Sequence, residues 1–368
     1  MRVTPQLDIL DTVFISNVDG GQNIPSVVFN GADYIVVFLD SRLTKGIVAS
    51  RVSPAGVVMD TGYTVNDGNN YPAAVPGAGR TLVLWSREFD AVCGRFVDGQ
   101  AVPQDTVMRI AAISASAARP AAAFDGSNYL VVWPDFGTTG TLDIFGRILI
   151  DGTPVDTPMV LVQGPEAENN PDIVFDGENY FLVWESGMGQ VRGLILDRAA
   201  KPITGPVVLS DTAFHLRQRP AAAAGLGCRF CFWSEYNSDY DIYGAIVHDI
   251  GIAAGGMGSP GIITIAPNPF RRATRISAGI RSATQFGGEG SGISIYDISG
   301  RLINSLSLPI PSEGRGLSSP WDGTTYSLLP TVVWDGTDQT GHAVPPGVYF
   351  VRLSAGSATA TVKIVKIE

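Results

Sequence analysis

Short apolar runs of four or five residues alternate along this chain with turns rich in glycine, asparagine and aspartate. Through the first 250 residues the runs form a unit that opens at a proline and recurs about every 49 residues. Asn-Gly or Asp-Gly closes the first run of three units, at 30–31, 125–126 and 176–177, and these dipeptides favour tight hairpins because both residues tolerate positive φ. The pattern predicts antiparallel strands joined by short turns. The five prolines are Pro25, Pro72, Pro120, Pro171 and Pro220.

The second run of each unit is continuously apolar, as in Tyr34–Phe38 and Tyr129–Trp133, which indicates a strand covered on both faces. A third run carries a small residue at a fixed place, where a neighbouring sheet could approach closely. A fourth run, such as Pro206–Ser210, leads to the next proline. Four short strands per unit are typical of a propeller blade, so residues 1–250 are expected to form a five-bladed β-propeller. The small residues are Ala49, Gly94, Gly146, Gly193 and Gly244.

The last unit has no convincing fourth run after residues 241–247. Thr12–Ser16 matches Pro206–Ser210 in character and lies at a similar distance from the following proline. We therefore expect the N-terminal segment to supply the outer strand of the last blade and to close the ring.

The remainder of the chain has a different pattern. Residues 251–261 are rich in glycine and predict a linker, and alternating runs such as Ile293/Ile295 and Val348/Phe350 suit half-buried strands. Residues 262–368 are thus expected to form a small immunoglobulin-like β-sandwich, which makes the whole chain all-β.

Composition narrows the classes of partner. The formal net charge of −10 argues against a nucleic-acid partner, because phosphate binding needs a basic surface. No run of 18 apolar residues exists, so no membrane-spanning segment is expected. The three cysteines are too few for a disulfide framework, so we expect free thiols. The chain is also expected to be a monomer. The first residues lack the apolar core of a signal peptide, so any export leader is expected to lie outside this sequence.

Two resemblances extend this interpretation. The repeat, with Asn128-Tyr-Leu-Val-Val-Trp133 and Asp241-Ile-Tyr-Gly244, resembles bacterial secreted propeller repeats over about residues 25–248. The set Ile293–Ile303, Val332–Asp338 and Pro346–Leu353 resembles the immunoglobulin-like domain of flagellar hook-capping proteins and the sorting domains of the type IX secretion system. These resemblances imply a secreted or cell-surface protein whose C-terminal region meets the secretion machinery. A sorting signal and a plain stalk both remain open.

An acidic residue follows the second strand of every unit, on the face of a propeller that usually carries ligands. Such carboxylates could bind a cation or act as acid and base on a sugar. A residue present in all five units could equally serve the blade itself by capping backbone N–H groups, and we favour this structural role. The candidates are Asp40, Glu88, Asp135, Glu185 and Glu235.

The fifth unit has one sharper feature. Oxygen-bearing side chains occupy Glu235, Asn237, Asp239 and Asp241, a spacing that could surround Ca²⁺ in a curled loop. The complete twelve-residue calcium-loop pattern is absent, so a solvated hairpin tip is the favoured interpretation and no cofactor is otherwise expected.

These observations leave three hypotheses for function. The leading one is a secreted or surface-attached binding or scaffolding protein without catalytic residues, whose partner is a carbohydrate or a surface protein. The alternative is a glycosidase-like carbohydrate-active enzyme that uses carboxylates at the channel mouth. A purely architectural part of a cell-surface layer is the third.

Overall fold

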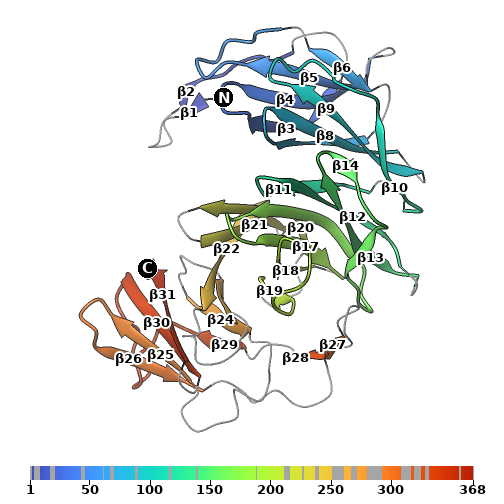
Figure 1. Ribbon diagram of the computed structural model, residues 1–368. Helices are drawn as coiled ribbons and strands as arrows, with labels where there is room; N and C mark the ends of the chain where they lie inside the picture. Colours follow the sequence, from blue (N-terminus) through green and yellow to red (C-terminus); the bar gives the residue numbers. More distant parts are fainter. Residues whose placement is uncertain are drawn as a thin grey trace. The chain divides into compact units, whose positions relative to one another are not determined.

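A computed structural model describes most of the chain. The described residues are 2–3, 9–16, 21–42, 46–60, 62–66, 70–87, 90–115, 118–137, 140–187, 189–210, 216–225, 228–236, 240–250, 261–266, 272–279, 292–307, 316–318, 325–327, 331–355 and 358–367. Within these ranges every regular element is a β-strand, which confirms the predicted all-β class (Figure 1). No helix in the described ranges is long and apolar enough to cross a membrane. The chain divides into two compact units, Met1–Met159 and Val160–Glu368.

The first unit contains three antiparallel sheets that each correspond to one sequence repeat. The first sheet has the order β3-β4-β5-β6, the second has the order β10-β9-β8-β7, and the third has the order β11-β12-β13-β14 with β15 also on β13. A two-stranded sheet of β1 and β2 precedes them. The bounds are β1 Arg2–Val3, β2 Ile9–Asp11, β3 Gln22–Phe29, β4 Tyr34–Asp40, β5 Ile47–Val52, β6 Tyr63–Asn66, β7 Asn70–Pro76, β8 Arg80–Arg87, β9 Ala91–Asp98, β10 Met108–Ala112, β11 Ala121–Phe124, β12 Asn128–Phe136, β13 Leu142–Ile150, β14 Thr153–Pro154 and β15 Met159–Val162.

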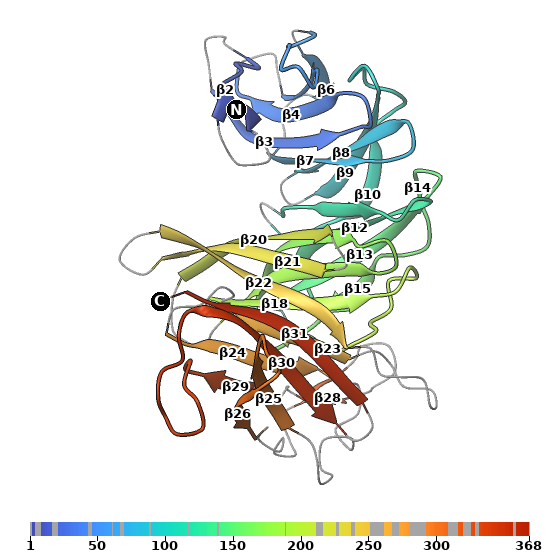
Figure 2. The same cartoon turned by 90° about the vertical axis from the view of Figure 1, so that its left-hand side faces the viewer.

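The second unit continues the repeat and then changes architecture. The fourth sheet has the order β16-β17-β18-β19, and the fifth repeat contributes β20, β21 and β22 to a six-stranded sheet that continues through β23, β24 and β29 (Figure 2). A further sheet has the order β26-β25-β30-β31, and β27 pairs with β28. The bounds are β16 Glu168–Phe175, β17 Tyr180–Ser186, β18 Gln190–Leu196, β19 Val207–Val208, β20 Leu216–Gly225, β21 Cys228–Tyr236, β22 Tyr240–Ile250, β23 Gly261–Ala266, β24 Thr274–Gly279, β25 Gly292–Asp297, β26 Leu302–Leu306, β27 Gly316–Ser318, β28 Thr325–Ser327, β29 Thr331–Trp334, β30 Gly347–Ala355 and β31 Ala358–Lys366.

The repeat proline marks a β-bulge. In four of the five repeats the residue before the proline has a left-handed φ, and the strand register shifts at the same place. Proline cannot donate to a ladder, and a bulge is one of the few places inside a strand that tolerates it. The residues are Ile24 (φ 51), Tyr71 (φ 55), Asn170 (φ 45) and Arg219 (φ 53).

Neighbouring sheets pack through alternate residues of their second strands. In the first sheet Ile35 and Val37 share a buried cluster with Val83 and Trp85 of the second. Because side chains alternate along a strand, Leu82 and Leu84 point the other way and share a cluster with the third sheet. The fourth and fifth sheets repeat this packing inside the second unit through Phe181, Val183, Cys231 and Trp233.

The small residue of the third strand makes room within its own sheet. A Cβ built on Gly94 would lie 3.2 Å from Leu82 and Leu84 side-chain atoms, and one on Gly244 would lie 2.8 Å from Phe232. These neighbours belong to the second strand of the same sheet, so the predicted approach of another sheet is not what these contacts show.

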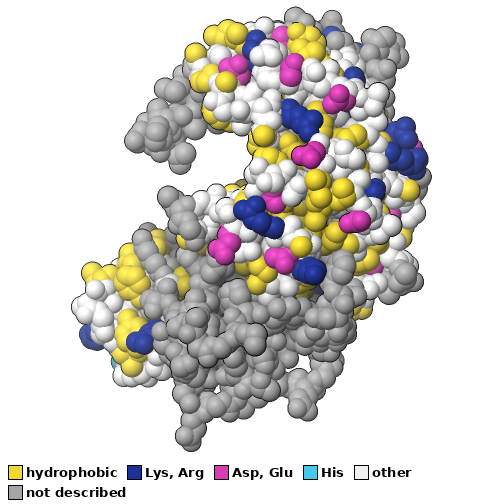
Figure 3. All heavy atoms as spheres, viewed as in Figure 1, with side chains coloured by type: hydrophobic (Ala, Val, Ile, Leu, Met, Phe, Trp, Pro, Cys, Tyr) yellow, Lys and Arg dark blue, Asp and Glu magenta, His cyan; other side chains and the backbone are white. Residues whose placement is uncertain are grey.

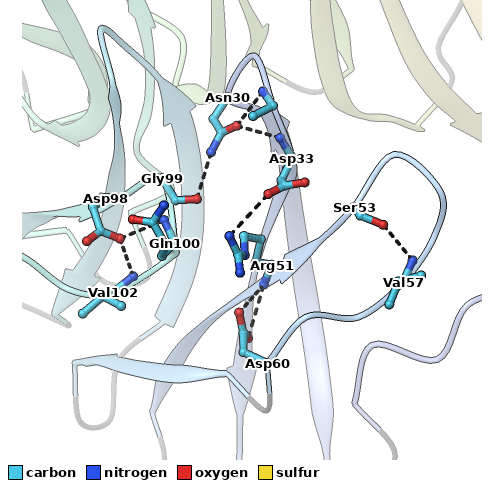
Figure 4. A network of polar contacts seen from close by, with 11 residues as sticks. Asn30, Asp33, Arg51, Ser53, Val57, Asp60, Asp98, Gly99, Gln100 and Val102 are labelled. Atoms are coloured by element: carbon cyan, nitrogen blue, oxygen red, sulfur yellow. Dashed lines mark hydrogen bonds and ion pairs between the residues drawn. The ribbon is translucent and has the colours of Figure 1, made fainter.

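Side-chain oxygens organise the turns. Asn30 Oδ1 accepts hydrogen bonds from the backbone N–H groups of Ala32 (3.0 Å) and Asp33 (2.9 Å), while its amide nitrogen donates to the Gly99 carbonyl of the second sheet (Figure 4). Asp98 caps the neighbouring turn by accepting from Gln100 and Val102 N–H (2.9 Å each). Asn and Asp at turn starts therefore serve the backbone, as expected for these residues.

The structure differs from the predicted ring closure. Thr12–Ser16 forms no strand, and Ile15 packs against the buried Val36 and Phe38 of the first sheet. The edge of β22 pairs instead with β23, where Val247 lies opposite Thr264. The outer strand of the fifth sheet thus comes from the chain that follows it.

The C-terminal region also differs in its boundary from the prediction. Residues 251–260 of the expected linker lie outside the described residues, and Gly261 already belongs to β23. Strands β23, β24 and β29 share one buried core with β25, β26, β30 and β31, centred on Trp334 and Tyr349. Two sheets around one core agree with a sandwich, while the immunoglobulin-like assignment stays a prediction.

Candidate functional site

The carboxylate of Asp40 is held by hydrogen bonds from the turn that follows it. It ends β4, is buried, and accepts hydrogen bonds from Arg42 Nε (2.9 and 3.0 Å) and from the Arg42 backbone N–H (3.1 Å). The hydrogen bond from the Arg42 guanidinium lowers the pKa of Asp40, so the carboxylate stays charged.

Asp135 caps a loop. Its Oδ1 accepts from the backbone N–H groups of Ser114 (2.9 Å), Ala115 (2.9 Å) and Phe136 (2.8 Å) and from the Ser114 hydroxyl (2.8 Å). Ser114 and Ala115 follow β10, so Asp135 joins the second sheet to the third.

Glu185 and Glu235 belong to the contact between the fourth and fifth sheets. Glu185 accepts from the backbone N–H of Arg219 (2.5 Å) at the bulge of β20. Glu235 is buried and accepts from Arg217 Nε (2.7 Å) and from the indole N–H of Trp233 (3.1 Å). Arg217 also donates to the Gly189 carbonyl (2.7 Å), which completes a buried polar network.

These acids are not equivalent in register. Asp40 lies opposite Gln22 and Glu235 lies opposite Arg217, each three residues before the repeat proline. Glu185 lies one residue earlier along its strand, because in the fourth sheet Ser186 occupies the position opposite Glu168. Successive strand residues point to opposite faces, so Glu185 faces away from the others. Glu88 lies outside the described residues.

The sequence reasoning missed Glu168. This buried carboxylate accepts from the indole N–H of Trp184 (2.5 Å) and from the Ser186 hydroxyl (3.1 Å). It does for Trp184 what Glu235 does for Trp233, but from the first strand instead of the second. An acidic residue three places before Pro171 was the available signal.

Asp172 was missed as well. It follows Pro171, accepts from the Ala222 N–H of the fifth sheet (2.8 Å), and has a pKa raised to about 6 by burial. The corresponding residue of the first sheet is Ser26, whose hydroxyl accepts from the Ala74 N–H (3.0 Å). The position therefore joins adjacent sheets, and an ionisable residue occupies it in the fourth.

The predicted calcium loop is described only at its two ends. Asn237 and Asp239 lie outside the described residues, Glu235 is held by Arg217, and the exposed Asp241 lies directly opposite Glu235. No group of three or more His, Cys, Asp or Glu side chains in the described part of the chain could hold a metal ion. The cation hypothesis stays a prediction.

Charged side chains of both signs are interspersed on the face shown in Figure 3. The described residues in that view show no large surface of a single sign.

Comparison with known proteins gives a limited result. No protein-family model matches the chain, and no curated protein matches it. Similar solved structures include an exo-1,5-α-L-arabinanase from a bovine ruminal metagenomic library (12% identity, 63% of this chain and 95% of that chain, TM-score 0.36). Another is the Bacteroides ovatus xyloglucan PUL GH43B protein (12%, 94% and 78%, TM-score 0.38). A Synechocystis apocarotenoid oxygenase mutant is also similar (9%, 72% and 64%, TM-score 0.43). At these TM-scores the likeness supports no conclusion about activity, and the architecture rests on the sheets of this chain.

Proposed function

We propose that the chain is a five-bladed β-propeller that serves as a binding or display platform outside the cytoplasm. The supporting observation is that the four described repeat acids all accept hydrogen bonds from donors in the blades themselves. A catalytic carboxylate must meet its substrate, whereas these carboxylates hold turns and neighbouring sheets together. The C-terminal sheets would serve export or attachment through the secretion machinery.

The ligand that we propose is a carbohydrate or a surface protein, and the protein would bind it as a monomer. Calcium would be an additional, optional ligand. This assignment follows the resemblances of the repeat and of the C-terminal motifs, and it is independent of the similar solved structures.

A carbohydrate-active enzyme is the second candidate, and the fourth sheet favours it. Glu168 and Asp172 are two carboxylates that lie on one strand in different surroundings, and burial raises the pKa of Asp172 to about 6. A general acid of a glycosidase needs such a raised pKa. Like the repeat acids, both residues accept hydrogen bonds within the sheets, so the raised pKa of Asp172 is the one feature that favours this second candidate.

One pair of measurements separates the two functions. The full chain is tested for binding to a polysaccharide panel and for release of reducing sugar from the same panel. Arabinan and xyloglucan are included because similar structures carry these names. We expect binding without sugar release.

Variants make the result decisive. Sugar release that is lost in Asp172→Asn and Glu168→Gln, and kept in Glu178→Gln, would establish the enzyme instead. Glu178 is an exposed acid of the same unit and serves as the matched control. The absence of both binding and sugar release, across glycans and cell-surface extracts, would contradict both functions.

A further inference from the structure

The residue before each repeat proline combines a fixed backbone with a variable side chain. In four of the five repeats it has a left-handed φ although none of these residues is glycine, and a following proline normally confines a residue to extended conformations. Backbone strain of this kind is typical of functional sites, where the surrounding structure holds a residue in an unfavourable conformation. The side chains found at this position are Ile24, Tyr71, Arg119, Asn170 and Arg219.

The backbone at this position is also held by hydrogen bonds in the fourth and fifth sheets. The Asn170 N–H donates to Asn169 Oδ1 (2.8 Å), and the Arg219 N–H donates to Glu185 Oε1 (2.5 Å). The proline that follows is buried in four of the five repeats. The fold thus fixes the point from which each of these side chains starts.

The polar groups of these side chains take no part in holding the fold together. The residue after the proline joins neighbouring sheets, as Ser26 and Asp172 show. By contrast, the four polar side chains before the proline make no hydrogen bond or ion pair in the described part of the chain. A few well-positioned polar side chains with spare donors are what a ligand site needs.

In the first unit two of these side chains meet. Strands β7 and β11 are neighbouring first strands, and the Arg119 guanidinium carbon lies 4.2 Å from the centre of the Tyr71 ring. Both side chains are half-buried. Cation–π attraction holds the guanidinium over the ring by its flat face, while its N–H donors lie in the guanidinium plane and stay free for a planar anion.

This arrangement differs from the other arginines that lie over aromatic rings in the described part of the chain. Arg80 lies over Phe96 and donates to the Asp151 carbonyl (3.0 Å), and Arg198 donates to the Gly177 carbonyl (3.3 Å). Their guanidinium groups therefore serve the backbone, whereas that of Arg119 does not.

We propose that Arg119 and Tyr71 form a binding subsite for the carboxylate of an acidic sugar, such as a uronic acid unit of a polysaccharide. Arg119 would donate two parallel hydrogen bonds to the carboxylate, and the Tyr71 hydroxyl would bind a hydroxyl group of the same sugar. This inference rests on the proposed function, because it names the class of carbohydrate that the platform binds.

The chemistry of the pair favours a carboxylate. The planar guanidinium matches a carboxylate in a bidentate geometry, and such charge-assisted bonds are about twice as strong as neutral ones. The chain has a net charge of −10, so an anionic ligand needs a cation that no carboxylate of the protein already neutralises. Among the described residues, Arg119 has no such partner.

An acidic sugar suits the pair better than an acidic peptide. The phenol hydroxyl both donates and accepts, and each uronic acid unit carries hydroxyl groups beside its single carboxylate. An acidic peptide would bring a high density of carboxylates and few hydroxyl groups to an acidic protein.

The test is isothermal titration calorimetry of the full chain with polygalacturonate, its fully methyl-esterified form, and polyglutamate. We expect binding to polygalacturonate that weakens as salt is added, and little binding to the ester or to polyglutamate. Arg119→Lys should lower the affinity about tenfold, because an ammonium keeps the charge but cannot form the paired hydrogen bonds. Tyr71→Phe keeps the ring and should lower it only about two- to fivefold.

Arg80→Ala is the matched control. It removes an arginine that also lies over a ring in the first unit, at the other end of the second sheet, since Arg80 pairs with Asp98 and Asn70 pairs with Ser86. Its affinity for polygalacturonate should equal that of the native chain. The Tm of Arg119→Lys should also stay close to the native value, which separates a lost ligand contact from a damaged fold.

Three results would overturn the inference. Equal affinity for polygalacturonate and its methyl ester would show that no carboxylate is recognised. Equal losses in Arg119→Lys and Arg80→Ala would show that only overall charge matters. Binding of polyglutamate that is as tight and equally sensitive to Arg119→Lys would assign the site to an acidic polypeptide.

The glycan panel keeps this inference separate from the proposed function. Binding to neutral glycans that is unchanged in Arg119→Lys, with none to polygalacturonate, would remove the acidic-sugar subsite and leave the binding platform. The absence of binding to every glycan and cell-surface extract would contradict both.

Discussion

At the residue scale, the acids of this chain act mainly as acceptors for its own backbone and side chains. Asp135 caps two N–H groups that follow β10, and Glu235 holds Arg217 and Trp233 together. Among the acids in the described part of the chain, Asp172 alone combines such a structural contact with a pKa raised to about 6. This difference makes it the residue whose ionisation should be visible in stability.

Asp172→Ser should stabilise the protein at neutral pH. Burial raises the pKa of Asp172 from 3.8 to about 6 in the folded state, so keeping it charged costs folding free energy that grows as pH rises from about 4 to 6. Serine keeps an acceptor, as Ser26 shows. We expect a gain of roughly 1–3 kcal/mol above pH 6 that shrinks towards pH 4.

Urea unfolding at pH 4 and pH 7.5 measures this effect. Asp197→Ser, at a turn aspartate that accepts from Ala199 and Lys201 N–H, is the control and should destabilise at neutral pH. A pH-independent difference between Asp172→Ser and the native chain would show that Asp172 ionisation carries no cost.

Arg217→Met should be strongly destabilising. The substitution leaves the buried Glu235 without its cation, which typically costs about 3–5 kcal/mol. Glu235→Gln in the same chain should recover part of the loss, because the neutral amide can still accept from Trp233. A double-mutant cycle from chemical unfolding gives the coupling, and additive losses would refute it.

At the scale of the element, the feature that repeats is the β-bulge in the first strand, which four of the five repeats show. It places a non-glycine residue at positive φ immediately before the proline, which costs on the order of 1–3 kcal/mol at each such residue. Asparagine tolerates this conformation best among the four residues found there, and isoleucine, being β-branched, tolerates it worst.

Ile24→Asn should therefore stabilise the first sheet by about 1 kcal/mol. Ile150→Asn, at an exposed strand position that lacks the positive φ, should give no gain. Thermal melts of the two variants report the difference, and an equal loss in both would mean that the bulge carries no relievable strain.

In the second and third sheets, an arginine after the third-strand glycine ties the sheet to the one before it. Arg95 donates to the Gln104 and Asp105 carbonyls (3.1 Å each) and to the Val65 carbonyl of the first sheet (2.9 Å), and Arg147 repeats this pattern with Ile110. Arg95→Lys should lose about 1–3 kcal/mol, because an ammonium cannot serve three carbonyls in this planar geometry. Chemical denaturation should place Arg95→Lys close to Arg95→Ala, and full recovery by lysine would contradict this account.

The sequence predicted local elements better than contacts between them. The run Tyr34–Phe38 lies within β4 and Tyr180–Trp184 within β17, because an apolar run and an Asx-Gly turn are local signals. The sequence did not show that the repeat acids point to different faces of their sheets. A shift of one residue, from Ser186 to Glu185, is enough to turn a side chain to the opposite face of the sheet. The role of Glu168 depends on a partner strand and leaves no periodic trace in the sequence.

At the scale of the whole molecule, the repeats and the C-terminal region are joined by hydrogen bonds. Strand β23 pairs with β22 on one side and with β24 on the other, so the fifth sheet continues into the C-terminal core. The expectation of a linker between independent domains rested on glycine content, and glycine content does not report which strand pairs with a free edge. Non-local pairing of this kind is what sequence periodicity cannot show.

Removal of residues 261–368 should consequently damage the repeats. The edge of β22 would lose its partner strand and present unpaired N–H and C=O groups, which favour aggregation. We expect the truncated chain to melt lower than the full chain and to associate in size-exclusion chromatography. A monomeric fragment with an unchanged Tm would restore the independent-domain interpretation.

The carboxylates that accept from the tryptophan indoles of the fourth and fifth sheets have a consequence for the design of a consensus repeat. Trp184 receives its carboxylate from the first strand, and Trp233 receives its own from the second. A consensus sequence of the five units could place both glutamates in every copy, where their two negative charges would repel each other. It could also place neither glutamate, which would leave the indole N–H without an acceptor. What the fourth and fifth units share is a donor–acceptor pair, and an idealised version of this repeat should transplant the pair intact.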